Sequence, residues 1–139
     1  PLGPEFALSM LANQLLAELL CSLHTFAVIV PNHAGSDVFR FASPAKGRGE
    51  FYLRQILGSV NYSTGSDTND FLHGWLNYQI EHHLWPDLTI LQYQAAQPRV
   101  QALCAELGIP YRQEPLWTRL QKLAKVAVGA GEMPYYSKT

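Results

Sequence analysis

A long apolar segment near the start of the chain constrains the fold more than any other feature. Residues 6–30 contain no proline or glycine, and 18 of these 25 residues are hydrophobic. Because a helix rises about 1.5 Å per residue, the segment is long enough to cross the roughly 30 Å apolar core of a bilayer. The sequence therefore predicts a transmembrane-like helix over 7–31, which Pro31 ends or kinks. The alternative is a buried core helix of a soluble bundle.

One face of this predicted helix is polar. Gln14, Glu18, Ser22 and Thr25 are spaced four, four and three residues apart, so they share a helical face. An apolar helix with such a stripe would face lipid on one side and protein or water on the other. A charged Glu18 inside a membrane is costly and would need a partner.

Composition limits the classes of protein to which the chain can belong. It has 139 residues, a formal net charge of −1, 47% hydrophobic residues and a mean hydropathy of −0.06. These values exclude a disordered chain, argue against nucleic-acid binding and fit one membrane span followed by a soluble remainder. Cys21 and Cys104 form no CxxC motif, so we expect reduced thiols and neither a disulfide scaffold nor a zinc–thiolate site.

The rest of the chain is predicted to be helical, which makes the fold class all-α. Residues 1–6 are either what remains of a cleaved tag or a native loop, and no signal peptide is readable. The excess of lysine and arginine after Pro31 places the region 32–139 on the cytoplasmic side. Caps, prolines and glycines predict helices over 68–84, 87–96 and 98–107, a helix that Pro115 opens and Gly129 closes, loops over 42–49 and 58–67, and no strands.

The segment Phe71 to Pro86, FLHGWLNYQIEHHLWP, carries the candidate chemistry. On a helix Gln79, His82 and His83 occupy positions i, i+3 and i+4 within an arc of about 100°, so their side chains can aim at one point. Neutral imidazoles suit iron, copper, nickel or zinc, although most adjacent histidine pairs are simply surface or core residues. Glu81 points nearly the opposite way. Two residues on the preceding turns are expected to shield the site from water: Leu72 and Trp75.

The string Gln79 to Pro86, QIEHHLWP, resembles the third histidine box of membrane fatty acid desaturases. Its leading glutamine is similar to the front-end and acyl-lipid branch. Further residues resemble the C-terminal part of a bacterial-type member: Asn77-Tyr78, Pro98, Val100, Leu103-Cys104 and Gly108-Ile109-Pro110-Tyr111. The resemblance covers about residues 7 to 133, so the chain is identified as the C-terminal part of such an enzyme.

This resemblance implies a helical integral membrane protein with a di-iron site on its cytoplasmic face. Such enzymes use O2 and two electrons from cytochrome b5 or ferredoxin to desaturate an acyl-lipid, acyl-CoA or acyl-ACP substrate. His82 and His83 would be iron ligands, and Gln79 would replace a histidine of other branches. His33, in the motif Pro31-Asn32-His33-Ala34-Gly35, matches a further ligand after the last membrane helix. Residues expected to support the ligands are Asn32, Asp37, which would orient His33, and His73; His24 is expected to be structural.

The chain also departs from the family pattern. The first two histidine boxes, HxxxH and HxxHH, are absent from it, and it has five histidines in all. We therefore expect an incomplete iron centre and no desaturase activity from this segment alone. Two alternatives remain: a related histidine-box hydroxylase or sphingolipid desaturase, and a non-catalytic soluble helical domain in which QxxHH is coincidental.

Overall fold

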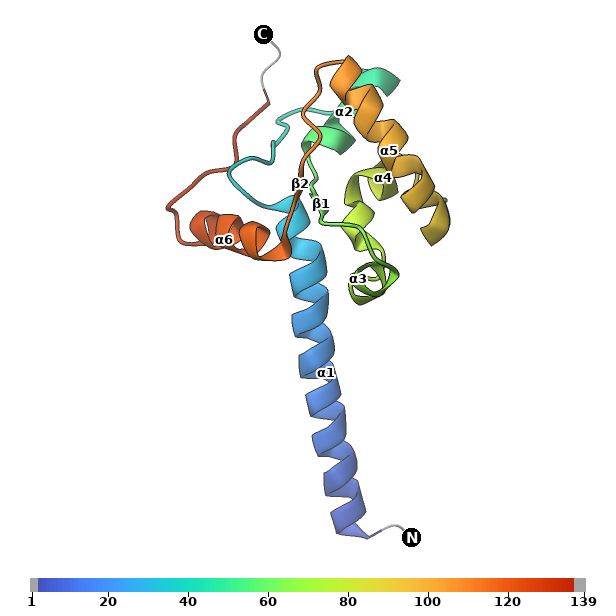
Figure 1. The fold of residues 1–139 in the computed structure, drawn as a ribbon. Helices are drawn as coiled ribbons and strands as arrows, with labels where there is room; N and C mark the ends of the chain where they lie inside the picture. Colours follow the sequence, from blue (N-terminus) through green and yellow to red (C-terminus); the bar gives the residue numbers. More distant parts are fainter. Residues whose placement is uncertain (1–2, 137–139) are drawn as a thin grey trace.

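A computed structural model describes residues 3–136. Most of them are helical, as predicted, and one long apolar helix precedes a small domain (Figure 1). The helices are α1 (Pro4–His33), α2 (Arg48–Leu57), α3 (Asp67–Leu72), the 3-10 helix η1 (Leu76–Tyr78), α4 (Gln79–Leu84), α5 (Ile90–Glu106) and α6 (Leu116–Ala127). Two short strands, β1 (Asn61–Tyr62) and β2 (Gln113–Glu114), pair in parallel and were not predicted.

Helix α1 projects from the domain as an isolated rod (Figure 1). Its apolar side chains face outward, with Leu8 68%, Leu15 62% and Leu23 58% exposed. Within the described residues, α1 is therefore not packed as a buried core helix. The helix is long and apolar enough to cross a membrane. Gln14 donates a 2.9 Å hydrogen bond to Glu18, which gives this carboxyl the partner that its position requires.

The ends of α1 differ from the prediction. The helix begins at Pro4, so residues 4–6 are helical rather than a loop, while residues 1–2 lie outside the described residues. Pro31 does not end it, because the helix continues to His33. A proline removes one backbone donor, but two more residues complete the last turn before Ala34 adopts an extended conformation.

The box helix α4 lies at the centre of the domain, against α2, α5, β1 and η1. Ile80 in α4 is fully buried and belongs to the main apolar cluster. The other members of this cluster come from α4 itself and from the neighbouring helices α2 and α5: Leu84, Ile56, Val100 and Cys104, with Tyr52, Ile109 and Tyr111 packed on its edge. The core therefore fixes α4 by its apolar face and leaves the histidines on the other side.

The segment 58–67, predicted to be a surface loop, is internal in its first half only. Ser59, Val60, Asn61 and Tyr62 are buried, and β1 pairs with β2 in the register Asn61 to Gln113. Serine, asparagine and glycine are common in exposed loops, but their small polar side chains also serve buried hydrogen bonding. The composition therefore predicted the wrong location for residues 59–62, whereas residues 63–67 are mostly exposed, as predicted.

Three predicted helices have bounds that differ from the prediction. The helix expected over 68–84 is broken, since Gly74 and Trp75 take left-handed backbone angles (φ 55° and 57°) and the Trp75 amide bonds the Asp70 carbonyl. The helices expected over 87–96 and 98–107 are one helix, α5, which continues through Pro98. The C-terminal helix is confirmed, with Pro115 as the N-cap of α6.

Candidate metal centre

Helix α4 carries the three residues singled out from the sequence. Gln79, His82 and His83 lie in one continuous helix, so the predicted i, i+3, i+4 arrangement is present. Gln79 is only 3% exposed, and its Oε1 has no hydrogen-bond partner among residues 3–136. Burying an amide oxygen without a hydrogen-bond partner is energetically costly, so this oxygen is available to coordinate a metal ion or to accept a hydrogen bond.

His33, the last residue of α1, meets the box helix across a separation of fifty residues in sequence. Its ring stacks on His83 with centroids 4.9 Å apart and planes 14° apart. The His82 and His83 rings are 6.0 Å apart. A ring N–H of His33 donates to the Gly58 carbonyl, which fixes the orientation of the ring. The fold thus forms two close histidine pairs that share His83.

Burial, together with the smaller effect of the nearby His33 and His82 rings, lowers the pKa of His83 to about 4. At neutral pH His83 is therefore uncharged, with a free ring lone pair. A neutral imidazole is the form that binds a metal.

Tyr93 in α5 contacts His82, the first histidine of the box, and no sequence pattern predicted this contact. Its hydroxyl lies 3.1 Å from His82 Nδ1 and donates to the Pro86 carbonyl at 3.2 Å. The carbonyls of Trp85 and Pro86 can only accept hydrogen bonds, so a hydroxyl that donates to one of them leaves its oxygen to accept from a protonated Nδ1 of His82. Nε2 is then the unprotonated nitrogen of the ring.

Glu81 lies on the far side of α4 from the ligand face, as predicted, and anchors the helix. It is fully buried and accepts hydrogen bonds of 2.8 Å from Asn61 Nδ2 and from the Tyr111 hydroxyl. Asn61 Oδ1 also accepts from the Ile80 amide at 2.7 Å. Burial raises the pKa of Glu81, although both hydrogen bonds favour its carboxylate. These contacts fix the rotation of α4 about its axis.

The three residues expected to support the ligands lie in different surroundings. Asn32 is fully buried and its Nδ2 donates to the carbonyls of Val28 and Leu76, which ties α1 to η1. Its Oδ1, like that of Gln79, has no partner in the described part of the chain. His73 Nδ1 bonds the Asn69 carbonyl at 2.8 Å, and its ring packs on Tyr62.

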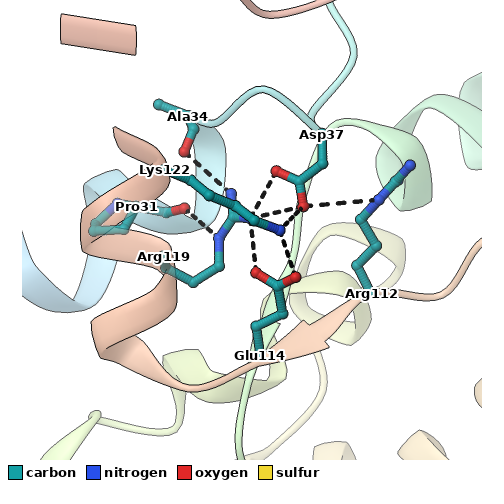
Figure 2. Close-up of polar contacts among 7 residues, drawn as sticks. All are labelled: Pro31, Ala34, Asp37, Arg112, Glu114, Arg119 and Lys122. Carbon is teal, nitrogen blue, oxygen red and sulfur yellow. Dashed lines mark hydrogen bonds and ion pairs between the residues drawn. The ribbon is translucent and has the colours of Figure 1, made fainter. Parts of the chain in front are cut away.

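Asp37 takes part in a charged cluster instead of bonding His33 (Figure 2). We call Asp37, Arg112, Glu114, Arg119 and Lys122 the five-charge cluster. Arg119 is fully buried and bonds Asp37 at 2.8 Å, and it also donates to the Pro31 and Ala34 carbonyls at the end of α1. Lys122 forms ion pairs with the carboxylates of both Asp37 and Glu114. The cluster attaches α6 to the end of α1, and no local sequence pattern predicted it.

The remaining residues named from the sequence lie apart from the ligands. Leu72 is 57% exposed and Trp75 sits in the left-handed turn, so the break after α3 removes the helical register that would have made them shield the site. His24 bonds the Leu72 carbonyl at 2.7 Å, consistent with a structural role. An apolar groove of about 360 Å³ adjoins the box through Leu84 and Trp85.

The side chains gathered at this site fit a metal ion only in part. Among residues 3–136, no group of three or more His, Cys, Asp or Glu side chains is placed so that it could hold a metal ion. The imidazoles of His33, His82 and His83 and the partnerless oxygen of Gln79 are nevertheless the nitrogen and oxygen donors that suit iron. The residues present fit part of an iron site.

The chain matches the family described as fatty acid desaturase over residues 6–115, which is most of its length. The chain belongs to this family. The family match includes α1, the box helix and the site residues described above, and it ends just before α6.

Individual desaturases agree with the family match. The chain is 33% identical over 112 residues to an NADPH-dependent stearoyl-CoA 9-desaturase of Mycobacterium tuberculosis, covering 78% of this chain and 26% of that protein. It is 32% identical over 123 residues to an acyl-lipid (8-3)-desaturase of Physcomitrium patens, covering 86% and 24%. A Delta(8)-fatty-acid desaturase of Euglena gracilis is 34% identical over 122 residues, covering 85% and 28%. The chain thus spans about a quarter of these desaturases. No solved structure matches it.

Proposed function

We propose that this chain is part of an O2-dependent fatty acid desaturase and that Gln79, His82, His83 and His33 contribute ligands to its iron centre. The stacking of His33 on His83 supports this most, because it joins the end of α1 to the box helix. Two irons in the intact protein would supply the oxidising chemistry. Two hydrogens leave the acyl chain, and with two electrons and two further protons they reduce one O2 to two waters.

The residues of this chain each have a defined task in that proposal. His83 is kept neutral by burial, so a lone pair is available at neutral pH. Tyr93 accepts the Nδ1 proton of His82 and leaves Nε2 to face the metal. The Gly58 carbonyl orients His33, and Glu81 prevents α4 from rotating. Asn32 joins α1 to η1 just before the box.

The setting of the site follows from α1. We propose that α1 spans the membrane and that the box lies on the cytoplasmic face, where the excess of positive charge after the helix favours it. Electrons would come from cytochrome b5 or ferredoxin, and the acyl substrate would be carried as a lipid, a CoA ester or an ACP ester. A soluble non-catalytic domain is disfavoured, because α1 exposes its leucines.

Fatty-acid profiling of cells that express the intact protein tests the proposal. The wild type is expected to yield a new double bond, and His82→Ala is expected to abolish it because a metal ligand is lost. His24→Ala is the matched control, since His24 lies away from the ligands, and it should retain activity. The chain of 139 residues expressed alone should yield no product, because it has too few histidines for two irons. Product from His82→Ala, or from this chain alone, would contradict the ligand assignment.

A further inference from the structure

The outer face of α6 is apolar and open. Trp117 is 70% exposed and Val128, which caps the helix, is 78% exposed. Ala124 is also exposed, and spacings of seven and four residues place all three on one side of the helix. Exposed Gln121 and Lys125 border this side. We call Trp117, Ala124 and Val128 the outer strip.

The opposite face of α6 points toward the loop that follows α1. Arg119 and Lys122 lie on that face and bind Asp37 in the loop, while Arg119 also bonds Pro31 and Ala34 at the end of α1. Figure 1 shows α6 extending sideways from the end of α1, with this loop on the side away from the N-terminus of α1. The outer strip therefore faces back toward the N-terminal part of α1.

The length of α1 sets the level of α6 relative to a membrane. Its 30 residues extend about 45 Å at 1.5 Å per residue, which matches a bilayer including both headgroup layers, about 40–45 Å. The end of α1, where Arg119 docks, then falls in a headgroup layer. On the other side of α1, Phe71 and Leu72 of α3 are 69% and 57% exposed, and the Leu72 carbonyl bonds His24 of α1.

We propose that α6 lies in the membrane interface with its outer strip against the acyl-chain boundary and Lys125 among the lipid headgroups. This inference rests on the proposed membrane span of α1. Tryptophan and lysine are the residues that favour this layer, where an indole is amphipathic and an ammonium meets anionic lipid. In this placement one bilayer covers both the outer strip and the exposed apolar surface of α1. The five-charge cluster then sets the angle between α6 and the membrane span.

Spin labels in vesicles test this placement. The chain is inserted in phosphatidylcholine–phosphatidylglycerol vesicles in a Cys21→Ser, Cys104→Ala background. Single labels are attached at Ala124→Cys and Val128→Cys, with Leu19→Cys in α1 and Leu107→Cys at the end of α5 as references for lipid and water. Leu19 and Leu107 are similarly exposed, at 56% and 60%. Collisions with lipid-soluble O2 are compared with collisions with a water-soluble nickel chelate.

We expect the O2-to-nickel collision ratio at positions 124 and 128 to exceed that at 107 several-fold and to lie below that at 19. A ratio at 124 and 128 equal to that at 107, with position 19 in lipid, would overturn the inference and leave the membrane span intact. A water-like ratio at position 19 would overturn the span and this inference with it. Immobile labels at 124 and 128 that neither reagent reaches would show that protein, such as a second copy, covers the strip, which also overturns the inference.

Discussion

Helix α1 and the domain that follows it distribute polar and apolar side chains in opposite ways. Along α1, large apolar residues such as Leu8 and Leu15 are more than 60% exposed. Inside the domain, Glu81 and Arg119 are fully buried, and so are several neutral polar residues: Asn32, Asn61 and Asn77. Each arrangement would be unfavourable in water without a compensating partner.

The partners differ in the two regions. Many buried polar groups of the domain are compensated by one another, as in the hydrogen bonds of Glu81 with Asn61 and Tyr111, although Asn32 Oδ1 and Gln79 Oε1 have no partner among the described residues. The apolar surface of α1 has no cover among the described residues, so its partner must come from outside them. Exposure of a single residue such as Leu107 therefore does not mark a lipid-facing surface, whereas the continuous exposed apolar surface of α1 is the pattern on which the proposed membrane span rests.

The largest expected effect comes from charges on α1. Leu16→Arg/Leu20→Arg should lower insertion into membranes by about 5–7 kcal/mol, since each arginine at the centre of a membrane helix costs about 2.5–3.5 kcal/mol. Leu107→Arg in the domain is the control, because Leu107 is 60% exposed, close to the 55% and 58% of Leu16 and Leu20. The fraction of protein that resists carbonate extraction measures insertion. Equal behaviour of the two variants would remove the distinction between the regions.

Loss of the buried guanidinium is expected to have the next largest effect. Arg119→Leu should reduce the free energy of unfolding by about 3 kcal/mol, because it leaves Asp37 and Glu114 with one cation fewer and two carbonyls at the end of α1 unbonded. Lys122→Met, at a side chain that is 26% exposed, should cost about 1 kcal/mol or less. Chemical unfolding in detergent compares the two. A larger loss for Lys122→Met would show that burial does not determine the importance of these charges.

A smaller effect is expected from removing the Tyr93 hydroxyl, which lies beside His82, the first histidine of the box. Tyr93→Phe should weaken metal binding by the intact protein about tenfold, because loss of a group that orients a ligand typically costs 10–100-fold. Nitrogen NMR of the metal-free protein should also show the His82 proton shifting from Nδ1 toward Nε2. Tyr52→Phe, at the edge of the core, serves as the control and should leave the tautomer unchanged. An unaltered His82 tautomer in Tyr93→Phe would rule out this role.

The smallest expected effect is a change in the stability of the protein at acidic pH. Burial alone would raise the pKa of Asp37, but hydrogen bonds and charges from Arg119 and Lys122 lower it below its usual value. Its contribution to stability is therefore complete above the unfolded-state pKa of about 3.9 and is lost as pH falls through the lower folded-state value. The stability difference between wild type and Asp37→Asn should shrink over that range in urea titrations. A difference that stays constant down to about pH 2 would contradict the cause given for the shift.

Local signals predicted part of this structure. The apolar run predicted α1, Pro115 and Gly129 predicted α6, and the spacing of Gln79, His82 and His83 predicted one face of α4. Each of these features depends on residues within a few turns of one another.

Features that depend on distant residues were not predictable in this way. Glu81 meets Asn61 and Tyr111 twenty and thirty residues away, and Asp37 was expected beside His33 but meets Arg119. The left-handed Trp75 is stabilised by the Asp70 carbonyl, which no propensity of tryptophan would suggest. Helix α5 also continues through Pro98, where the local pattern predicted a boundary.

The central claim is that the box helix and the end of α1 together hold iron in the intact protein. Metal analysis of the purified intact protein, compared with a His33→Ala/His83→Ala variant and with His24→Ala, tests it most directly. We predict that iron copurifies with the wild type and with His24→Ala and is largely lost from the double variant, while circular dichroism shows unchanged helix content. Iron retained at the wild-type level by the folded double variant would contradict the claim.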